Sequence, residues 1–110
     1  MDPIQQQVDA YNARDLERFL ACYAPEVVVE NAAGERMMEG HAGMRAVYAP
    51  LFANSPDLHA EVVTRITVGE FVVDEERVRG LNLPGFPPEM HAAVVYQVRG
   101  GQIVHVRLLA

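Results

Sequence analysis

The stretch from residue 11 to residue 48, YNARDLERFLACYAPEVVVENAAGERMMEGHAGMRAVY, constrains the fold more than any other part of the chain. Its apolar residues follow a helical spacing first, then the alternating spacing of a strand, and then a helical spacing again. Pro25, Gly34 and Gly40 separate these segments. Such residues end helices and favour turns. The stretch therefore predicts a helix, a short strand, a turn and the start of another helix.

Two helices are expected before that strand. The first covers residues 3–13, with Asp2 as its N-cap. The second starts after the cap Asp15 and buries apolar residues at i, i+3, i+4 and i+7, of which Tyr23 is the last. We expect Pro25 to end this helix, because the residue before a proline avoids the helical conformation.

The strand at residues 27–31 is short and rich in β-branched residues, and it places Val27, Val29 and Asn31 on one face. Further elements expected in this half are a turn at 32–35, a brief strand at 36–39 and a helix that begins at Gly40 and is kinked or restarted at Pro50.

The second half of the chain predicts a sheet. Four β-rich segments, divided by glycines and by a proline-rich loop, cover residues 58–68, 70–80, 90–99 and 102–109. They are apolar on both faces, whereas an antiparallel sheet with one face in water alternates between apolar and polar residues. We therefore expect one face to pack against the helices and the other to bind a second copy of the chain.

Length and charge limit the classes of protein and partner. A chain of 110 residues has room for one domain, residues 1–110. Nine basic residues against 15 acidic ones give a net charge of -6, which argues against binding to nucleic acid or to an anionic membrane.

The cysteine and histidine residues, and the lack of a recognisable targeting segment, bear on cofactors and on location. Cys22 is the single cysteine, and the four histidines lack the spacing of metal ligands. We therefore expect no metal and no other cofactor. Neither a signal peptide nor an apolar run of membrane-spanning length is recognisable, so the expected location is the cytoplasm.

The order and spacing of the segments resemble the nuclear-transport-factor-2-like superfamily, and within it the polyketide-cyclase and ketosteroid-isomerase-like branch. The resemblance is carried by NARDLE, YAPEVVVEN, EGHAGMR and the GGQI hairpin, together with VVDEERVRG at 72–80 and VVYQVRGGQIVHVR at 94–107. It implies an α+β cone, in which a curved antiparallel sheet wraps over the N-terminal helices. It further implies an apolar pocket at the wide end and a homodimer formed through the outer sheet face.

The resemblance also implies which residues line the pocket. The general-base aspartate, the oxyanion tyrosine and the protonated aspartate of the ketosteroid isomerases match Asn31, Gln7 and Val94, so the three chemical groups of that mechanism are absent. Asn31 cannot take a proton from carbon at neutral pH, and Gln7 is a much weaker donor to developing negative charge. Two supporting tyrosines match Tyr23 and Tyr48. The expected ligand-binding set is Gln7, Tyr11, Tyr23, Asn31, Tyr48, Val94 and Tyr96. Asn31 has an alternative role, since asparagine also caps turns such as the one that follows it.

Glu76 is the only candidate catalytic residue. In one interpretation Asp74, Glu75 and Glu76 form the tip of a hairpin. In the other they lie within a strand, and Glu76 faces the pocket, where burial raises its pKa and makes it a general acid or base. If the acids are structural instead, Arg79 and Arg107 are the expected cross-strand partners.

Two functions remain open from the sequence. The first is a small-molecule-binding protein or low-specificity enzyme, acting by proton transfer on an apolar, oxygen-bearing ligand. The second is a non-catalytic homodimeric module whose interior is filled. A cavity of about 300 Å³ or more with converging polar groups would favour the first, and methionine and tyrosine side chains that fill it would favour the second. The apolar loop at 81–89 is either a lid over the pocket or part of the dimer contact.

Overall fold

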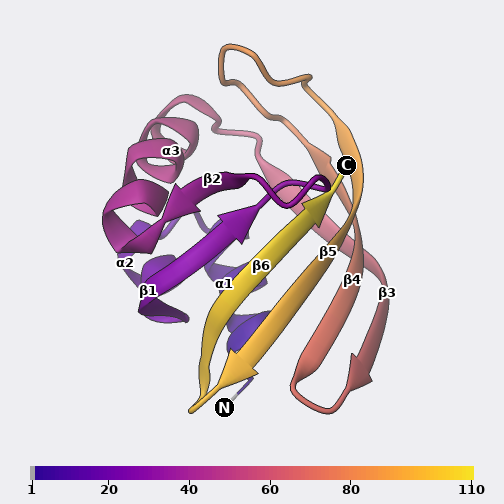
Figure 1. The fold of residues 1–110 in the computed structure, drawn as a ribbon. Coiled ribbons are helices and arrows are strands. Elements are labelled where there is room, and N and C mark those ends of the chain that lie inside the picture. The colour runs from indigo at the N-terminus through magenta and orange to yellow at the C-terminus, as the bar shows by residue number, and fades with distance from the viewer. Residues whose placement is uncertain (1) are drawn as a thin grey trace.

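The computed structural model describes residues 2–110 and has the expected α+β architecture, a curved sheet with the helices on its concave side (Figure 1). Its elements are α1 (Pro3–Asn12), α2 (Leu16–Ala21), β1 (Tyr23–Glu30), β2 (Arg36–Glu39), α3 (Gly40–Asn54), β3 (His59–Val68), β4 (Phe71–Arg79), β5 (Met90–Arg99) and β6 (Gln102–Leu109). The strand order is β2-β1-β6-β5-β4-β3. Neighbouring strands are antiparallel except β1 and β6, which are parallel.

The two N-terminal helices begin where the sequence predicts. The Asp2 side chain accepts a hydrogen bond from the backbone N–H of Ile4 at 3.0 Å, and Asp15 accepts one from the N–H of Arg18 at 3.2 Å. These carboxylates satisfy donors that a helix cannot pair internally.

The predicted end of α2 is wrong. The helix ends at Ala21, and Tyr23 is the first residue of β1 rather than the last of the helical stripe. The physical reason is pairing with β6, because the Ile103 N–H donates to the Cys22 carbonyl at 2.9 Å and Tyr23 lies opposite Ile103. Pro25 follows in an irregular stretch of the β1–β6 ladder, where its missing N–H leaves no gap in the pairing.

The four long strands confirm the predicted sheet segments and correct the hairpin interpretation of residues 74–76. The chain turns between β3 and β4 at Gly69 and Glu70, whereas Asp74 lies opposite Arg65 in β3 and Val94 in β5. Continuous pairing on both sides keeps this part of β4 extended.

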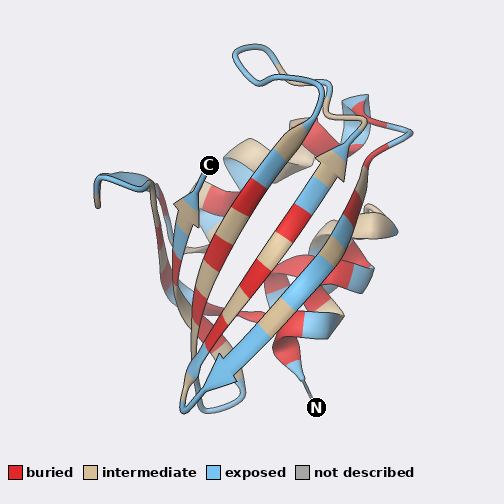
Figure 2. Ribbon diagram, turned by 90° about the vertical axis from the view of Figure 1, so that its right-hand side faces the viewer, coloured by how far each residue is buried: buried red, intermediate tan, exposed pale blue. Residues whose placement is uncertain are grey.

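Residues along the middle of β4 and β5 alternate between buried and more exposed (Figure 2), which places successive side chains on the inner and the outer face of the sheet. Asp74 and Glu76 point inward, and Glu75 between them points outward to the His91 ring at 2.7 Å. The partners expected for the acids were wrong, since Arg65 pairs with Asp74 and Arg107 with Glu30. Both arginines bind the carboxylate opposite them in register. Of the helices in the described part of the chain, none is long and apolar enough to cross a membrane.

Gly80 ends β4 and connects it to the loop at 81–89. Its φ of +75° lies in the region that favours glycine, and a Cβ there would overlap the carbonyl group of Asp57. Gly80→Ala should lower the free energy of unfolding by at least ~2 kcal/mol more than Gly100→Ala, in a urea titration. Gly100 is the matched control, because its φ is +59° and its Cβ would meet nothing within 4 Å. Equal losses in the two variants would contradict the overlap.

Candidate functional site

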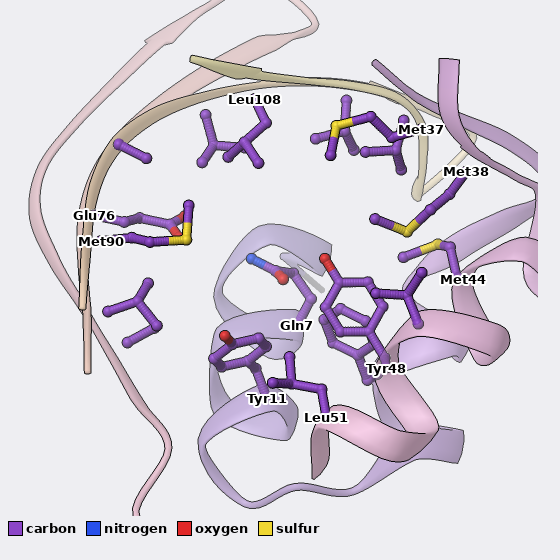
Figure 3. Close-up of a pocket in the computed structure, with 18 of the residues that line it drawn as sticks. Gln7, Tyr11, Met37, Met38, Met44, Tyr48, Leu51, Glu76, Met90 and Leu108 are labelled. Carbon is purple, nitrogen blue, oxygen red and sulfur yellow. The ribbon is translucent and has the colours of Figure 1, made fainter. Parts of the chain in front are cut away.

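A cavity of about 120 Å³ lies between the inner face of the sheet and the helices. Figure 3 shows Glu76 and Met90 reaching into it from the sheet, and Gln7, Tyr11 and Tyr48 from the helices opposite. The wall is otherwise mostly apolar, and four methionines contribute to it: Met37, Met38, Met44 and Met90.

A chain of buried hydrogen bonds runs from β1 to β4 through α1 and β5. The Tyr23 hydroxyl donates to Gln7 Oε1 at 2.9 Å. Gln7 Nε2 donates to the Tyr96 hydroxyl at 3.1 Å, and that hydroxyl donates to Glu76 Oε2 at 2.9 Å. Every donor in the chain points toward the carboxyl group of Glu76. Hydrogen bonds aligned in this way polarise one another.

Glu76 is 9% exposed, and burial of its carboxyl group raises the pKa from 4.5 to about 7. The Tyr96 hydrogen bond and the charge of Arg65 lower this pKa, while the charge of Asp74 raises it. Desolvation outweighs the stabilising contacts, because it disfavours the charged form of an acid. Glu76 therefore exchanges a proton near neutral pH, which is what a general acid or base requires.

The two oxygens of Glu76 differ. Oε2 accepts the hydrogen bond from Tyr96, whereas none of the hydrogen bonds of residues 2–110 reaches Oε1. No buried side-chain oxygen or nitrogen in this range lacks a partner, so Oε1 is accessible to solvent from the cavity that Glu76 lines. Oε1 is therefore the oxygen of Glu76 that a molecule in the cavity can reach.

Tyr11 and Tyr48 provide two further polar groups at the cavity. Burial is the main cause that raises the pKa of Tyr11, and it raises the pKa of Tyr48 to about 12, so both hydroxyls stay protonated at neutral pH. Neither hydroxyl hydrogen-bonds to another described residue, and neither is a buried atom without a partner. Both can therefore donate to a molecule in the cavity.

Arg65 and Asp74 form an ion pair beside the site. Asp74 is fully buried, and both of its oxygens bind the Arg65 guanidinium, at 2.7 and 2.9 Å. Gln5 in α1 accepts a third bond from this guanidinium, at 2.9 Å. The pair balances the buried charge of Asp74 and links β3 and β4 to α1.

Seven of the eight residues expected at the site line the cavity: Gln7, Tyr11, Tyr23, Tyr48, Glu76, Val94 and Tyr96. The eighth, Asn31, does not, and its expected position in the pocket is wrong. Its Oδ1 accepts hydrogen bonds from the N–H groups of Ala33 and Glu35, both at 3.0 Å, and its Nδ2 donates to the Glu35 side chain. Asn31 caps the turn after β1, as its alternative interpretation proposed.

The loop at 81–89 contributes to the wall of the cavity. Leu81, Leu83 and Phe86 line it, and Phe86 remains 40% exposed. The base of the loop is fixed, because the buried Ser55 hydroxyl accepts from the Asn82 N–H at 3.0 Å. The sequence predicted methionine side chains in the interior only for the filled module, and none of the four that line the cavity was among the expected site residues.

The other reactive residue types lie in structural contacts. His41 binds the Tyr23 carbonyl at 2.8 Å, and Cys22 donates to the Arg18 carbonyl at 3.4 Å. Burial raises the pKa of the Cys22 thiol, which makes it a poorer nucleophile. Within residues 2–110 there is no group of three or more histidine, cysteine, aspartate or glutamate side chains arranged to hold a metal ion.

Comparison with known proteins agrees with this architecture. The family model of the SnoaL-like domain matches residues 4–106, so the chain belongs to the SnoaL-like family. No curated protein matches its sequence significantly.

Solved structures with the same fold cover nearly the whole chain. An uncharacterised cystatin-fold protein from Novosphingobium aromaticivorans is 27% identical with a TM-score of 0.88, and the match covers 100% of this chain and 99% of that one. IdmH from Streptomyces antibioticus, a candidate polyketide cyclase, is 26% identical with a TM-score of 0.77, over 96% and 87% of the two chains. A candidate polyketide cyclase from Sinorhizobium meliloti shares the fold at 19% identity, with a TM-score of 0.78 over 96% and 92%.

The raised pKa of Glu76 predicts a pH-dependent stability. Because the pKa is about 7 in the folded state and 4.5 for the free side chain, the folded state holds the proton more tightly. The stability is then fully present below the unfolded pKa and is lost as the pH rises through the folded pKa. Glu76→Gln removes this loss. As the pH rises from about 4 to about 9, the free energy of unfolding of the variant should therefore increase by ~3 kcal/mol relative to that of wild type.

Urea titrations at several pH values measure this difference. Glu75→Gln is the control, because Glu75 lies next in the same strand but faces outward. It should retain the loss of stability of the wild type between pH 5 and about pH 8. A Glu76→Gln variant whose stability falls with pH as steeply as that of wild type would contradict the assignment.

Proposed function

We propose that this protein binds a small, apolar, oxygen-bearing molecule in the cavity and catalyses proton transfer on it, with Glu76 as the acid–base group. The observation that carries the proposal is the convergence of three unpaired polar atoms on one apolar cavity. These are Glu76 Oε1 and the hydroxyls of Tyr11 and Tyr48. The fold supports it as well, since the relatives named above include candidate polyketide cyclases.

The chemistry follows from the positions of these groups. A ketone oxygen accepts hydrogen bonds from the tyrosine hydroxyls, and Glu76 Oε1 removes a proton from the adjacent carbon. The C–H bond breaks, its electron pair moves into the enolate, and an O–H bond forms on Glu76. Donors aimed at the developing negative charge stabilise the transition state. Return of the proton to the same carbon gives exchange, and return to another carbon gives an isomer, so no co-reactant is needed.

The alternative function is a non-catalytic homodimeric module with a filled interior. One observation favours it, because a cavity of about 120 Å³ is smaller than the about 300 Å³ of a pocket for a drug-sized ligand, and four methionines line it. The converging polar groups favour the ligand-binding function instead. An apolar interior with no ligand has no use for a buried carboxyl group, whose desolvation destabilises the fold.

Hydrogen–deuterium exchange tests the catalytic proposal without knowledge of the natural substrate. The protein should accelerate exchange of the α-hydrogens of cyclohexanone in D₂O, as followed by NMR. Glu76→Gln should lower this acceleration by about 100-fold or more, because a positioned general base contributes that much. Glu75→Gln is the control and should exchange as fast as wild type. Exchange that is equally fast in Glu76→Gln would remove the catalytic role, and absence of both exchange and binding would favour the filled module.

We also propose that the partner at the outer sheet face is a second copy of this chain. Ile66, Val68 and Phe71 lie there around the β3–β4 turn, and they are 55%, 68% and 44% exposed. Exposed apolar groups of this kind mark interaction surfaces. The same face carries acid–base pairs within the chain, such as Glu75 with His91 and Glu30 with His105, so it presents both signs of charge, and a two-fold axis brings such a face against its own copy.

The dimer predicts a particle of about twice the chain mass of 12.2 kDa in sedimentation equilibrium. Val68→Glu should shift the equilibrium toward the monomer, because it introduces a charge into the contact. Ala42→Glu in α3 is the control, since this exposed residue lies on the helical side of the sheet. A wild-type protein that stays monomeric at high concentration would exclude the dimer.

A further inference from the structure

The volume of the cavity limits its ligand to about one ring. The cavity holds about 120 Å³. An apolar cavity of about 150 Å³ holds benzene, whereas drug-sized ligands occupy about 300–1,000 Å³. A single six-membered ring with a small substituent fits this volume, and two fused rings exceed it.

The walls that set this limit come from both sides of the cavity. Met90 in β5 lies beside Glu76, and Met37 in β2 lies on the opposite side (Figure 3). Methionine side chains adapt their shape to a ligand, but rotation redistributes their volume within the cavity and does not remove it. Truncating one of them is therefore the direct way to enlarge the space.

The charges around the cavity select a neutral ligand. Among the described residues that line it, Glu76 is the only carboxyl group, and no arginine or histidine is present. An anionic ligand would meet this carboxyl group without a compensating cation, at a high cost of desolvation. An ammonium ligand can pair with the Glu76 carboxylate, but its own desolvation in the apolar cavity opposes binding, and it offers no acceptor for the hydroxyl hydrogens of Tyr11 and Tyr48.

The two tyrosines select an acceptor oxygen. Their ring centroids are 6.3 Å apart, and their hydroxyls reach into the cavity from α1 and α3. A carbonyl oxygen has two lone pairs and can accept from both hydroxyls. A carbonyl compound held by this end directs the rest of its ring toward the sheet, where Glu76 lies.

We infer that the ligand is a neutral monocyclic carbonyl compound, whose oxygen binds Tyr11 and Tyr48 and whose adjacent C–H bond faces Glu76. This inference rests on the proposed function and adds to it the size and charge of the ligand.

Thermal melting and calorimetry with ketones of increasing size test the inference. Cyclohexanone should raise the melting temperature and bind about tenfold or more tightly than the fused bicyclic ketone 1-decalone, because overfilling a packed interior is unfavourable. Cyclohexanecarboxylate and cyclohexylammonium, which have the same ring, should bind about tenfold or more weakly than cyclohexanone. Equal or tighter binding of 1-decalone would overturn the size limit, and equal or tighter binding of either ion would overturn the neutral ligand.

Met90→Ala should reverse the size preference and let 1-decalone bind more tightly than cyclohexanone. Val95→Ala is the matched control, because it removes apolar volume from the same strand but outside the cavity, and it should keep the wild-type preference. Met37→Ala provides the same test from β2 if Met90→Ala does not fold. A size preference that both methionine variants leave unchanged would contradict the role of these walls.

The outcomes separate this inference from the proposed function. If 1-decalone binds wild type well and its α-hydrogens exchange in a Glu76-dependent way, the size limit fails and the proton transfer stands. If no ketone binds to wild type or to the enlarged variants, both fail.

Discussion

The site depends on a carboxyl group that is held in an apolar interior by a single hydrogen bond. Burial of Glu76 opposes its negative charge, and the Tyr96 hydroxyl supports it. Gln7 fixes that hydroxyl in turn, and its amide is oriented by the Tyr23 hydroxyl. Because Gln7 and Tyr96 each donate one hydrogen bond and accept another in this chain, neither can be inverted alone without breaking the next contact. The chain therefore fixes which oxygen of Glu76 is free.

The same contacts hold the helices on the sheet. Gln7 and Gln5 both lie in α1, and they bind Tyr96 in β5 and Arg65 in β3 across the interface. Apolar packing of Phe19 in α2 on Tyr23 in β1 supplies a non-directional part of the contact between helices and sheet, with ring centroids 5.1 Å apart. The directional hydrogen bonds also fix the position of α1 along the strands. The same hydrogen bonds thus position the site and attach α1 to the sheet.

Much of this architecture was readable from the sequence, for identifiable reasons. The caps Asp2 and Asp15, and the β-rich composition and glycine boundaries of the last four strands, are local signals, and they predicted the elements well. The end of α2 was not readable, because the pairing of Tyr23 with Ile103 joins residues 80 positions apart. Likewise, propensity alone left residues 74–76 open between a turn and a strand, and only pairing with β3 and β5 decided it.

For the site, side-chain parity along β4 correctly placed Glu76, and the resemblance placed the tyrosines and Gln7. Asn31 was the exception. It has the parity of Val27 and Val29, but the strand ends at Glu30 with an irregular register, and the side chain turns to its own loop. The Arg65–Asp74 pair was missed, because Arg65 lies after an irregularity in β3 that changes which residues face inward. Sequence alternation cannot be followed through such a bulge.

The parallel pairing of β1 with β6 has a consequence for the order of folding. β1 pairs with β2 on one edge and with β6, the last strand in the sequence, on the other. During synthesis this second edge of β1 therefore stays unpaired until β6 has been made. Contacts between such distant segments form slowly, because a long loop must close first. Within the sheet, only residues 102–109 join the β2–β1 pair to the strands β5, β4 and β3. The cavity has walls from both groups of strands, and Val106 and Leu108 of β6 complete its lining between them.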